Sequence, residues 1–162
     1  MRRRMRLMYI LSAGTLALVV LGGTTLAQSD PHLGTWKLNI AKSTYDPGPP
    51  PKSDTRVNEL WETDGYTQIT TVVQADGTHT DARLSAHYDG KDYKVTGWPD
   101  AETIAVKRVD ANTTDFTLKR GGKVVETGNI VLTNNGKTRT ITTRGTDAKG
   151  QKVNIVAVYD RQ

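Results

Sequence analysis

Apolar and polar residues alternate with a period of two along most of the chain after residue 30, as is typical of half-buried β-strands. No segment of this region carries apolar residues at a sustained helical spacing. The positions that share one face of an expected strand are Trp36, Leu38 and Ile40; Ala82, Leu84, Ala86 and Tyr88; Phe116 and Leu118; and Val153, Ile155, Ala157 and Tyr159. The pattern therefore predicts an all-β domain.

Dipeptides that favour tight turns separate these strands at regular intervals. They are Asp64-Gly65, Asp76-Gly77, Asp89-Gly90, Gly121-Gly122 and Asn135-Gly136, with Lys149-Gly150 as a weaker sixth. Asn-Gly and Asp-Gly pairs adopt the positive φ angles that tight hairpin turns require. A further turn is expected at Ala111 and Asn112, between strands 102–110 and 114–120. Regular hairpins without long crossings predict an antiparallel up-and-down meander.

The two ends of such a meander would be exposed sheet edges, and closing the sheet removes them. We therefore expect an all-β, antiparallel up-and-down barrel of about 8–10 strands, with a two-sheet β-sandwich as the alternative. Segment 41–55, which holds four of the six prolines, predicts a stiff loop between the first two strands. This loop either covers the mouth of the barrel or is a plain surface connection.

The first 27 residues have the layout of a secretory signal peptide. Four arginines precede an apolar run, and the small residues Thr25 and Ala27 follow it. We expect cleavage after Ala27, with Ser29 as the second choice, so that residues 28–162 form a single exported domain, periplasmic or secreted. The alternative is an uncleaved membrane anchor, because the apolar run from Leu7 to Leu26 approaches the length of a membrane span.

Removal of the signal peptide changes the charge balance of the chain. The full chain has 22 basic and 17 acidic residues, and the signal peptide contains four arginines but no acidic residue. The mature domain is therefore almost neutral, which argues against a basic surface for nucleic acid. The chain also has no cysteine, so the exported domain must be stable without disulfides.

Both ends of the domain resemble known barrel families. Gly34-Thr35-Trp36, within GTWKL, resembles the first-strand Gly-x-Trp motif of lipocalins and fatty-acid-binding proteins. The terminal IVAVYDRQ is similar to the T-R-x-Y-E-K strand of fatty-acid-binding proteins. The segments GTWKLN, YDGKDY and GTDAKGQ also resemble a group of uncharacterised exported bacterial proteins of lipocalin-like type. The resemblance implies a calycin barrel with an interior ligand site.

The resemblance also implies roles for individual residues. Tyr159 matches the T-R-x-Y tyrosine, but Ala157 stands where that motif has the arginine that holds a ligand carboxylate. In lipocalins an arginine of the last strand lies over the motif tryptophan. Arg161 and Arg144 are both candidates for this cation–π contact with Trp36, so the structural motif would comprise Gly34, Trp36 and Arg161.

Catalytic and metal-binding patterns are weak in this sequence. His79 and His87 lie roughly 26 Å apart on one expected strand, too far to share a metal ion. No G-x-S-x-G motif is present, and the Asp-Gly turns account for Asp64, Asp76 and Asp89. We therefore expect neither a metal, nor a cofactor, nor catalysis. Isomerase or hydratase chemistry inside a barrel is a low-ranked alternative.

We interpret the chain as a small exported binding module, a monomer, that holds a small apolar ligand inside its barrel. The candidate ligand-binding residues are Trp36, Trp61, Tyr88, Phe116 and Tyr159. Trp36 is expected to lie deep at the closed end, and the ligand to enter beside the proline segment. The alternative is a barrel filled with its own side chains that serves as an envelope or interaction protein.

Overall fold

The computed structural model describes residues 30–162, so the expected signal peptide and its cleavage site lie outside the described residues. The elements are β1 (Gly34–Leu38), the 3₁₀ helix η1 (Ile40–Lys42), β2 (Thr44–Asp46), β3 (Ser53–Trp61), β4 (Gly65–Val73), β5 (His79–His87), β6 (Asp89–Thr96), β7 (Thr103–Arg108), β8 (Thr113–Arg120), β9 (Lys123–Thr133), β10 (Thr138–Thr146) and β11 (Lys152–Arg161). The domain is all-β, as the alternation predicted.

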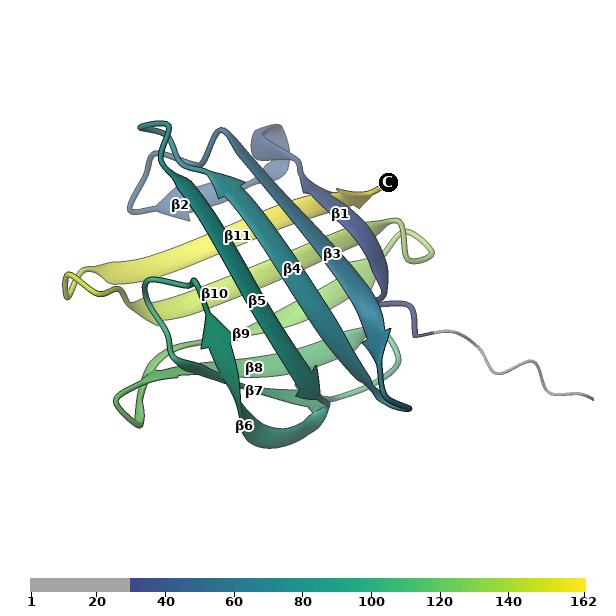
Figure 1. Cartoon of the computed structure of the whole chain (residues 1–162). Coiled ribbons are helices and arrows are strands. Elements are labelled where there is room, and N and C mark those ends of the chain that lie inside the picture. The colour runs from purple at the N-terminus through teal and green to yellow at the C-terminus, as the bar shows by residue number, and fades with distance from the viewer. Residues whose placement is uncertain (1–29) are drawn as a thin grey trace, which may run out of the picture.

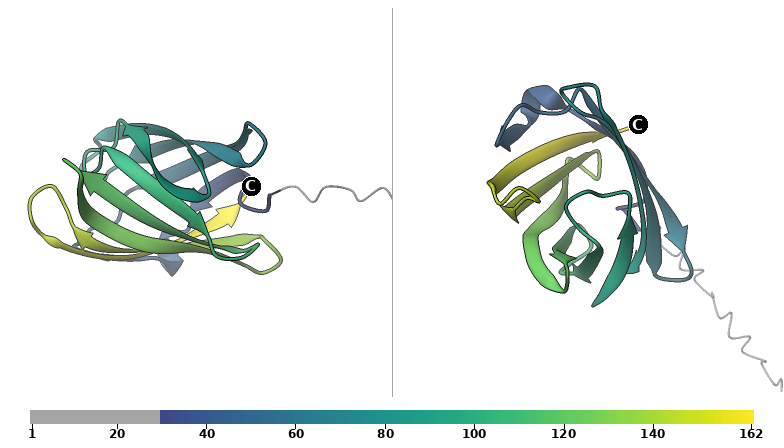
Figure 2. Two further views of the ribbon diagram at one scale, coloured as in Figure 1. Left: turned by 90° about the horizontal axis from the view of Figure 1, so that it is seen from below. Right: turned by 60° about the vertical axis from the view of Figure 1, so that its left-hand side comes forward.

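Ten of the strands form a closed antiparallel barrel (Figures 1 and 2). From β3 to β11 each strand pairs with the next, and β1 pairs with both β3 and β11. Because the first and last barrel strands join, the sheet has no free barrel edge. The barrel prediction is confirmed, and the alternative of a two-sheet sandwich is excluded.

The last strand is long enough to pair with two segments from the beginning of the domain. Its final residues pair with β1, where Tyr159 lies opposite Leu38, and its middle pairs with β2, where Ile155 lies opposite Tyr45. The sequence predicted that segment 41–55 is a loop. This prediction is only partly right, because the segment contributes β2 to the sheet. β2, the one strand of residues 30–162 that is not part of the ten-stranded barrel, extends the barrel wall on the side of the proline segment.

The prediction that Ile40 continues the first strand is wrong. The strand ends at Leu38, and Ile40 begins η1 with 41% of its surface exposed. Asn39 causes this break, because its side chain accepts a hydrogen bond from the Lys42 amide at 3.3 Å and caps the short helix. Its backbone carbonyl also accepts a hydrogen bond from the Ser43 hydroxyl at 2.7 Å.

The β5–β6 connection also differs from the prediction. The chain bends at Tyr88, and Asp89 and Gly90 already belong to β6 rather than to a hairpin tip. Gly90 has a φ of +77° and lies where the pairing of β6 with β7 is irregular, so it forms a bulge. Only two residue pairs join β5 to β6, at Arg83 and Leu84, so the wall is most weakly paired here.

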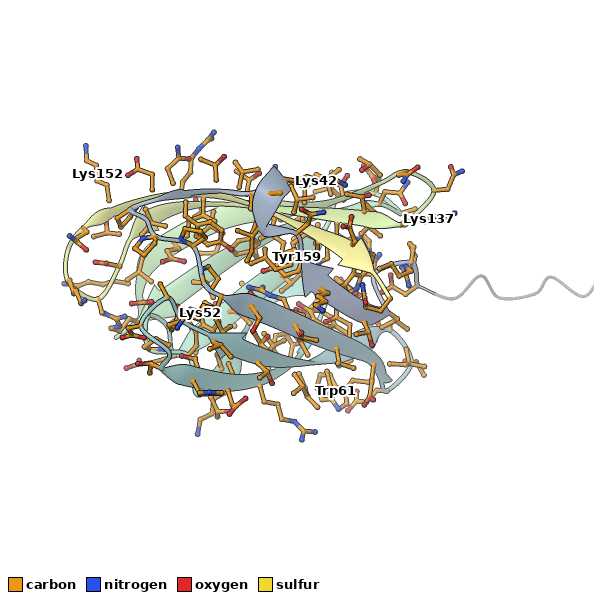
Figure 3. All side chains as sticks on the ribbon, turned by 90° about the horizontal axis from the view of Figure 1, so that it is seen from above. Lys42, Lys52, Trp61, Lys137, Lys152 and Tyr159 are labelled. Carbon is orange, nitrogen blue, oxygen red and sulfur yellow. The ribbon has the colours of Figure 1, made fainter. Side chains whose placement is uncertain are left out.

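The interior faces follow the predicted alternation. The alternating residues expected inside β5, β8 and β11 are buried or partly buried. Polar side chains are also buried inside the barrel, among them Asp54, Asn58, Gln68, Thr70, Glu126 and Arg139. Figure 3 shows side chains filling much of the space between the walls, with Tyr159 pointing inward. Of these groups, Asp54, Gln68, Thr70 and Glu126 line a cavity inside the barrel.

Candidate functional site

The barrel encloses a cavity of about 370 Å³. Its walls are largely apolar and include Val72, Leu84, Val95, Ile104, Leu118 and Ile130. This volume lies at the lower end of the range of pockets that hold small-molecule ligands. The barrel is therefore not completely filled by its own side chains.

The proline segment closes one side of the cavity mouth. Pro47, Pro49 and Pro51 all line the cavity, together with Tyr45 of β2. Of the two possibilities for this segment, the structure shows the covering loop. Stiff prolines hold the loop across the opening without requiring amide hydrogen bonds. The segment therefore shapes the opening of the cavity.

The opposite end of the barrel is closed by the first described residues and by Arg161. The Arg161 guanidinium lies 4.3 Å from the centre of the Trp36 ring, and its Nη1 donates to the Leu33 carbonyl at 2.7 Å. Its Nη2 donates to the Pro31 carbonyl, and its Nε donates to the Gly136 carbonyl at 2.7 Å. Of the two expected candidates for the contact with Trp36, the structure selects Arg161 rather than Arg144.

His32 is the buried centre of this closed end. Its carbonyl accepts hydrogen bonds from Trp36 Nε1 at 3.2 Å and from Asn58 Nδ2 at 3.0 Å. Burial, together with the positive charge of Arg139, lowers the pKa of His32 to about 4, so the imidazole is neutral at pH 7. The neighbouring ring of Tyr88 lies 3.6 Å beneath the guanidinium of Arg108. These contacts make the closed end a packed plug rather than an opening.

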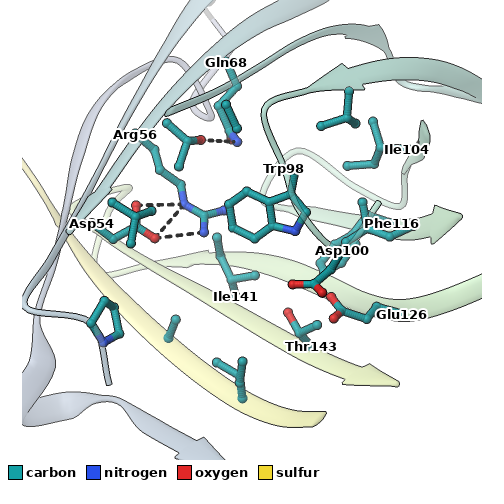
Figure 4. A pocket seen from close by; sticks show the side chains of 18 of the residues that line it. Asp54, Arg56, Gln68, Trp98, Asp100, Ile104, Phe116, Glu126, Ile141 and Thr143 are labelled. Carbon is teal, nitrogen blue, oxygen red and sulfur yellow. Dashed lines mark hydrogen bonds and ion pairs between the residues drawn. The ribbon is translucent and has the colours of Figure 1, made fainter. Parts of the chain in front are cut away.

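An ion pair lines the middle of the cavity. Arg56 Nη2 donates to Asp54 Oδ2 at 2.9 Å (Figure 4). The Tyr159 hydroxyl donates to the same oxygen at 2.6 Å. Burial alone would lower the pKa of Arg56, but the Asp54 carboxylate keeps it above its ordinary value. Burial raises the pKa of Tyr159 well above its ordinary value, so its hydroxyl stays a donor. The charges of Arg56 and Asp54 therefore cancel each other.

Arg139 is a buried arginine without a counter-ion among the described residues. Only 1% of its surface is exposed, and its one hydrogen bond, from Nη2 to Gln68 Oε1, is long at 3.4 Å. Its Nε and Nη1 have no hydrogen-bond partner within residues 30–162. Burial and the nearby charge of Arg56 lower the pKa of Arg139 to about 10, so it remains charged at pH 7. The inner end of the interior therefore carries an uncompensated positive charge.

Glu126 lines the cavity nearer the opening. It comes from β9 and is 7% exposed, and Asp100 and Asp147 line the same cavity. Burial, followed by the repulsion of these two carboxylates, raises the pKa of Glu126 to about 7. Figure 4 shows Asp54 and Arg56 on one side of the pocket and the Asp100 and Glu126 carboxyl groups on the other, with Trp98 between them. The cavity is therefore electrically asymmetric.

The five candidate ligand-binding residues fall into three places. Phe116 and Tyr159 line the cavity. Trp36 is fully buried at the closed end, and Tyr88 lies there on Arg108 and against Tyr66, with ring centres 5.2 Å apart. The structure thus brings two of the five to the cavity wall and two to the plug behind it.

Trp61 lies away from the cavity. It has the opposite parity on β3 to the inward-facing Arg56, so its side chain is outside the barrel. There it contacts His87 and Tyr93, with ring centres 4.6 and 6.2 Å away. Gly65 between them allows this approach, since a Cβ on it would lie 3.0 Å from the Trp61 ring. Trp61 therefore covers the outside of the wall near the weak β5–β6 pairing.

Sequence reasoning missed the charged residues of the interior. They are Asp54, Arg56, Glu126 and Arg139. The sequence did indicate that Arg139 faces inward, because it lies two residues before the apolar Ile141 and therefore on the same face of the strand. Asp54 and Arg56 alternate in the same way with outward residues of β3. A charge at an inward position of a strand was the pattern that could have identified them.

Within residues 30–162, no group of three or more His, Asp and Glu side chains is placed to hold a metal ion. The same part of the chain has no helix of sufficient length and apolar character to cross a membrane.

Comparison with known proteins gives a likeness of fold. No protein-family model matches the chain, and no curated protein does. Among solved structures, the wild-type fluorescent protein UnaG superimposes with a TM-score of 0.53 and 16% sequence identity, covering 81% of this chain and 97% of UnaG. A mutant of UnaG gives a TM-score of 0.54 and 18% identity, with coverage of 82% and 96%. The chain therefore has the calycin barrel fold that its two ends resembled.

Proposed function

We propose that the protein binds a small molecule with an apolar body and an acidic group inside its barrel. The observation that carries this proposal is the cavity of about 370 Å³, with largely apolar walls that include Gln68. The Gln68 side chain contacts the buried guanidinium of Arg139, which has two nitrogen atoms without a hydrogen-bond partner in the described part of the chain. A buried charge without a partner is costly, and a bound anion would relieve that cost. The cavity argues against the alternative of a barrel without a ligand.

The arrangement of charges suggests how the ligand would lie. Gln68 lines the cavity and accepts a long hydrogen bond of 3.4 Å from Arg139 Nη2, while its own Nε2 donates to Thr70 Oγ1 at 3.0 Å. A rotation of the Gln68 side chain would open the guanidinium to an acidic group of the ligand. The apolar body would then extend between Phe116 and Trp98 toward the proline segment. Arginine suits this role because its charged N–H groups form strong hydrogen bonds with carboxylates.

The experiment is a titration with 8-anilinonaphthalene-1-sulfonate, a dye with an aromatic body and an anionic group, followed by displacement with decanoate. We expect saturable binding to one site and competitive displacement. The variant Ala157→Phe fills the cavity, because Ala157 lines it, and should abolish binding. The control Ala105→Phe places the same ring on the outer face of β7 and should bind like the wild type.

Two results would contradict the proposal. One is that the wild-type protein binds neither the dye nor decanoate. The other is that Ala157→Phe binds the dye as well as Ala105→Phe does, which would place the dye on the surface. Circular dichroism of both variants shows whether each still folds as a β-protein.

We also propose that the domain is exported after removal of residues 1–27. Asp30, three residues after the expected cleavage site, forms a bidentate ion pair with Arg108 at 2.6 and 3.1 Å. Cleavage after Ala27 would leave that pair intact. The mass of the protein recovered from its native cells tests this proposal, and a retained Met1 would contradict it.

A further inference from the structure

Glu126 is an acidic side chain held at the cavity wall without a hydrogen bond or ion pair to any other described residue. Its residue is 7% exposed, and buried polar groups normally have a partner. Arg120, a cation whose charge acts on Glu126, instead donates to the Pro99 carbonyl at 3.0 Å and to Asp100 Oδ1 at 3.4 Å. Glu126 therefore presents its acceptor oxygens to the cavity.

A glycine on the neighbouring strand makes room for Glu126. Gly145 on the neighbouring strand lies so close that a Cβ there would be 2.6 Å from the Glu126 Cα and 2.9 Å from its Cγ. The absence of a Cβ at Gly145 therefore leaves the Glu126 side chain the space that it occupies, and a larger residue there would displace it. Asp100 is held directly, because its Oδ1 accepts a hydrogen bond from the Ala148 amide at 2.9 Å. One carboxylate near the opening is thus anchored, and the other has space made for it.

The surroundings of Glu126 favour a positively charged group. Asp100 and Asp147 line the same part of the cavity, and Thr143 adds a hydroxyl (Figure 4). The Trp98 ring also lines the cavity, and it already has the Arg56 guanidinium 5.8 Å from its centre. An aromatic face next to carboxylates is a favourable site for an ammonium group.

We propose that Glu126, with Asp100, Thr143 and the face of Trp98, forms a second polar subsite that binds an ammonium group of the ligand. The inference rests on the proposed function, because it places the acidic group of the same ligand at the inner end. The ligand class is then a bipolar molecule, with an acid at one end of an apolar body and an amine at the other. Its amine would lie near the opening.

The charge state of Glu126 gives the subsite a pH dependence. Burial raises the pKa of Glu126 to about 7, so the carboxylate is largely ionised at pH 8 and largely protonated at pH 5.5. The other charged groups facing it are Asp100, Asp147 and Arg120. Binding of an amine should therefore weaken as the pH falls, whereas a ligand without an amine should not show this loss.

The test compares two probes of similar length, decanoate and 10-aminodecanoate, by displacement of the anionic dye from the full protein at pH 8 and pH 5.5. At pH 8 we expect Glu126→Gln to bind 10-aminodecanoate at least about tenfold more weakly than the wild type, since a charge-assisted hydrogen bond is lost. Decanoate should bind the variant as tightly as the wild type, or more tightly. Glu59→Gln, which changes an exposed residue of β3, is the control.

The outcomes separate this inference from the proposed function. If the variant weakens both probes equally, or neither, the subsite is overturned while the binding function stands. If the wild type binds neither probe, the proposed function itself fails. A loss for 10-aminodecanoate alone, present at pH 8 and absent at pH 5.5, supports the subsite.

Discussion

Replacing Arg139 by methionine should stabilise the protein and weaken ligand binding at the same time. Methionine has a similar length, is apolar and adapts to irregular packing. It removes a guanidinium that is 1% exposed and has two nitrogen atoms without hydrogen-bond partners in the described part of the chain. Replacing a poorly compensated buried charge by an apolar side chain of similar volume often increases stability.

The size of the effect follows from the surroundings of Arg139. The fall of its pKa from 12.5 to about 10, mainly through burial, corresponds to about 3 kcal/mol of lost stabilisation of the charged form. The substitution also removes the long contact with Gln68 and the contact with Trp36 at 5.7 Å, worth about 1 kcal/mol together. We therefore expect the free energy of unfolding to rise by about 2 kcal/mol, and Tm by about 5–10 °C.

Urea unfolding at pH 7, followed by circular dichroism, measures the stability. The control is Arg144→Met on the same strand, where the arginine is exposed and should matter by less than about 0.5 kcal/mol. Dye titration of the same variants should show at least about tenfold weaker binding for Arg139→Met only. A loss of stability of 2 kcal/mol or more in Arg139→Met would refute the reasoning, because it would mean that the guanidinium is well paired.

Three further outcomes are expected. Glu126→Gln should raise the free energy of unfolding at pH 8 by up to about 3 kcal/mol and should leave it unchanged below pH 4. The reason is that the pKa of Glu126 is raised in the folded state, so the wild-type protein loses stability as the pH rises from 4.5 to above 7; urea unfolding of both proteins across this range checks the prediction. Arg161→Lys should lower the free energy of unfolding by about 3 kcal/mol, since one ammonium cannot replace three hydrogen bonds and the contact with Trp36; an unchanged urea midpoint would contradict this. Gly128→Ala should lower Tm strongly, because its Cβ would lie 1.9 Å from the Thr142 carbonyl oxygen. Gly121→Ala has open space around it and adds only the backbone strain of a φ of +55°, so it should lower Tm less; equal losses by calorimetry would contradict the packing argument.

The barrel was predictable because its signals are local. Asn135-Gly136 and Asp76-Gly77 mark hairpins through their own backbone preferences. Trp36 and Tyr159 could be placed on the joining strands from alternation and resemblance. The strand β2 could not be foreseen, since its partner Ile155 lies far along the chain and proline neighbours indicate a loop. Ile40 was misassigned because the cap by Asn39 outweighs the alternation.

The candidate site was predictable only in part. Apolar character marked Phe116 and Tyr159 correctly as inward residues that line the cavity. The same criterion also selected Trp61, whose position on β3 points outward. It passed over Arg56 and Arg139, because charged residues are expected to face solvent. Their burial depends on partners from other strands, and a single strand does not reveal those partners.

The most direct test of the central claim is a crystal structure of the protein with decanoate. We expect the alkyl chain inside the barrel between Phe116 and Trp98, and the carboxylate about 3 Å from the Arg139 guanidinium, with Gln68 rotated aside. An empty cavity in crystals grown at saturating decanoate would contradict the account. So would a carboxylate that lies at the proline segment while the guanidinium stays unpaired.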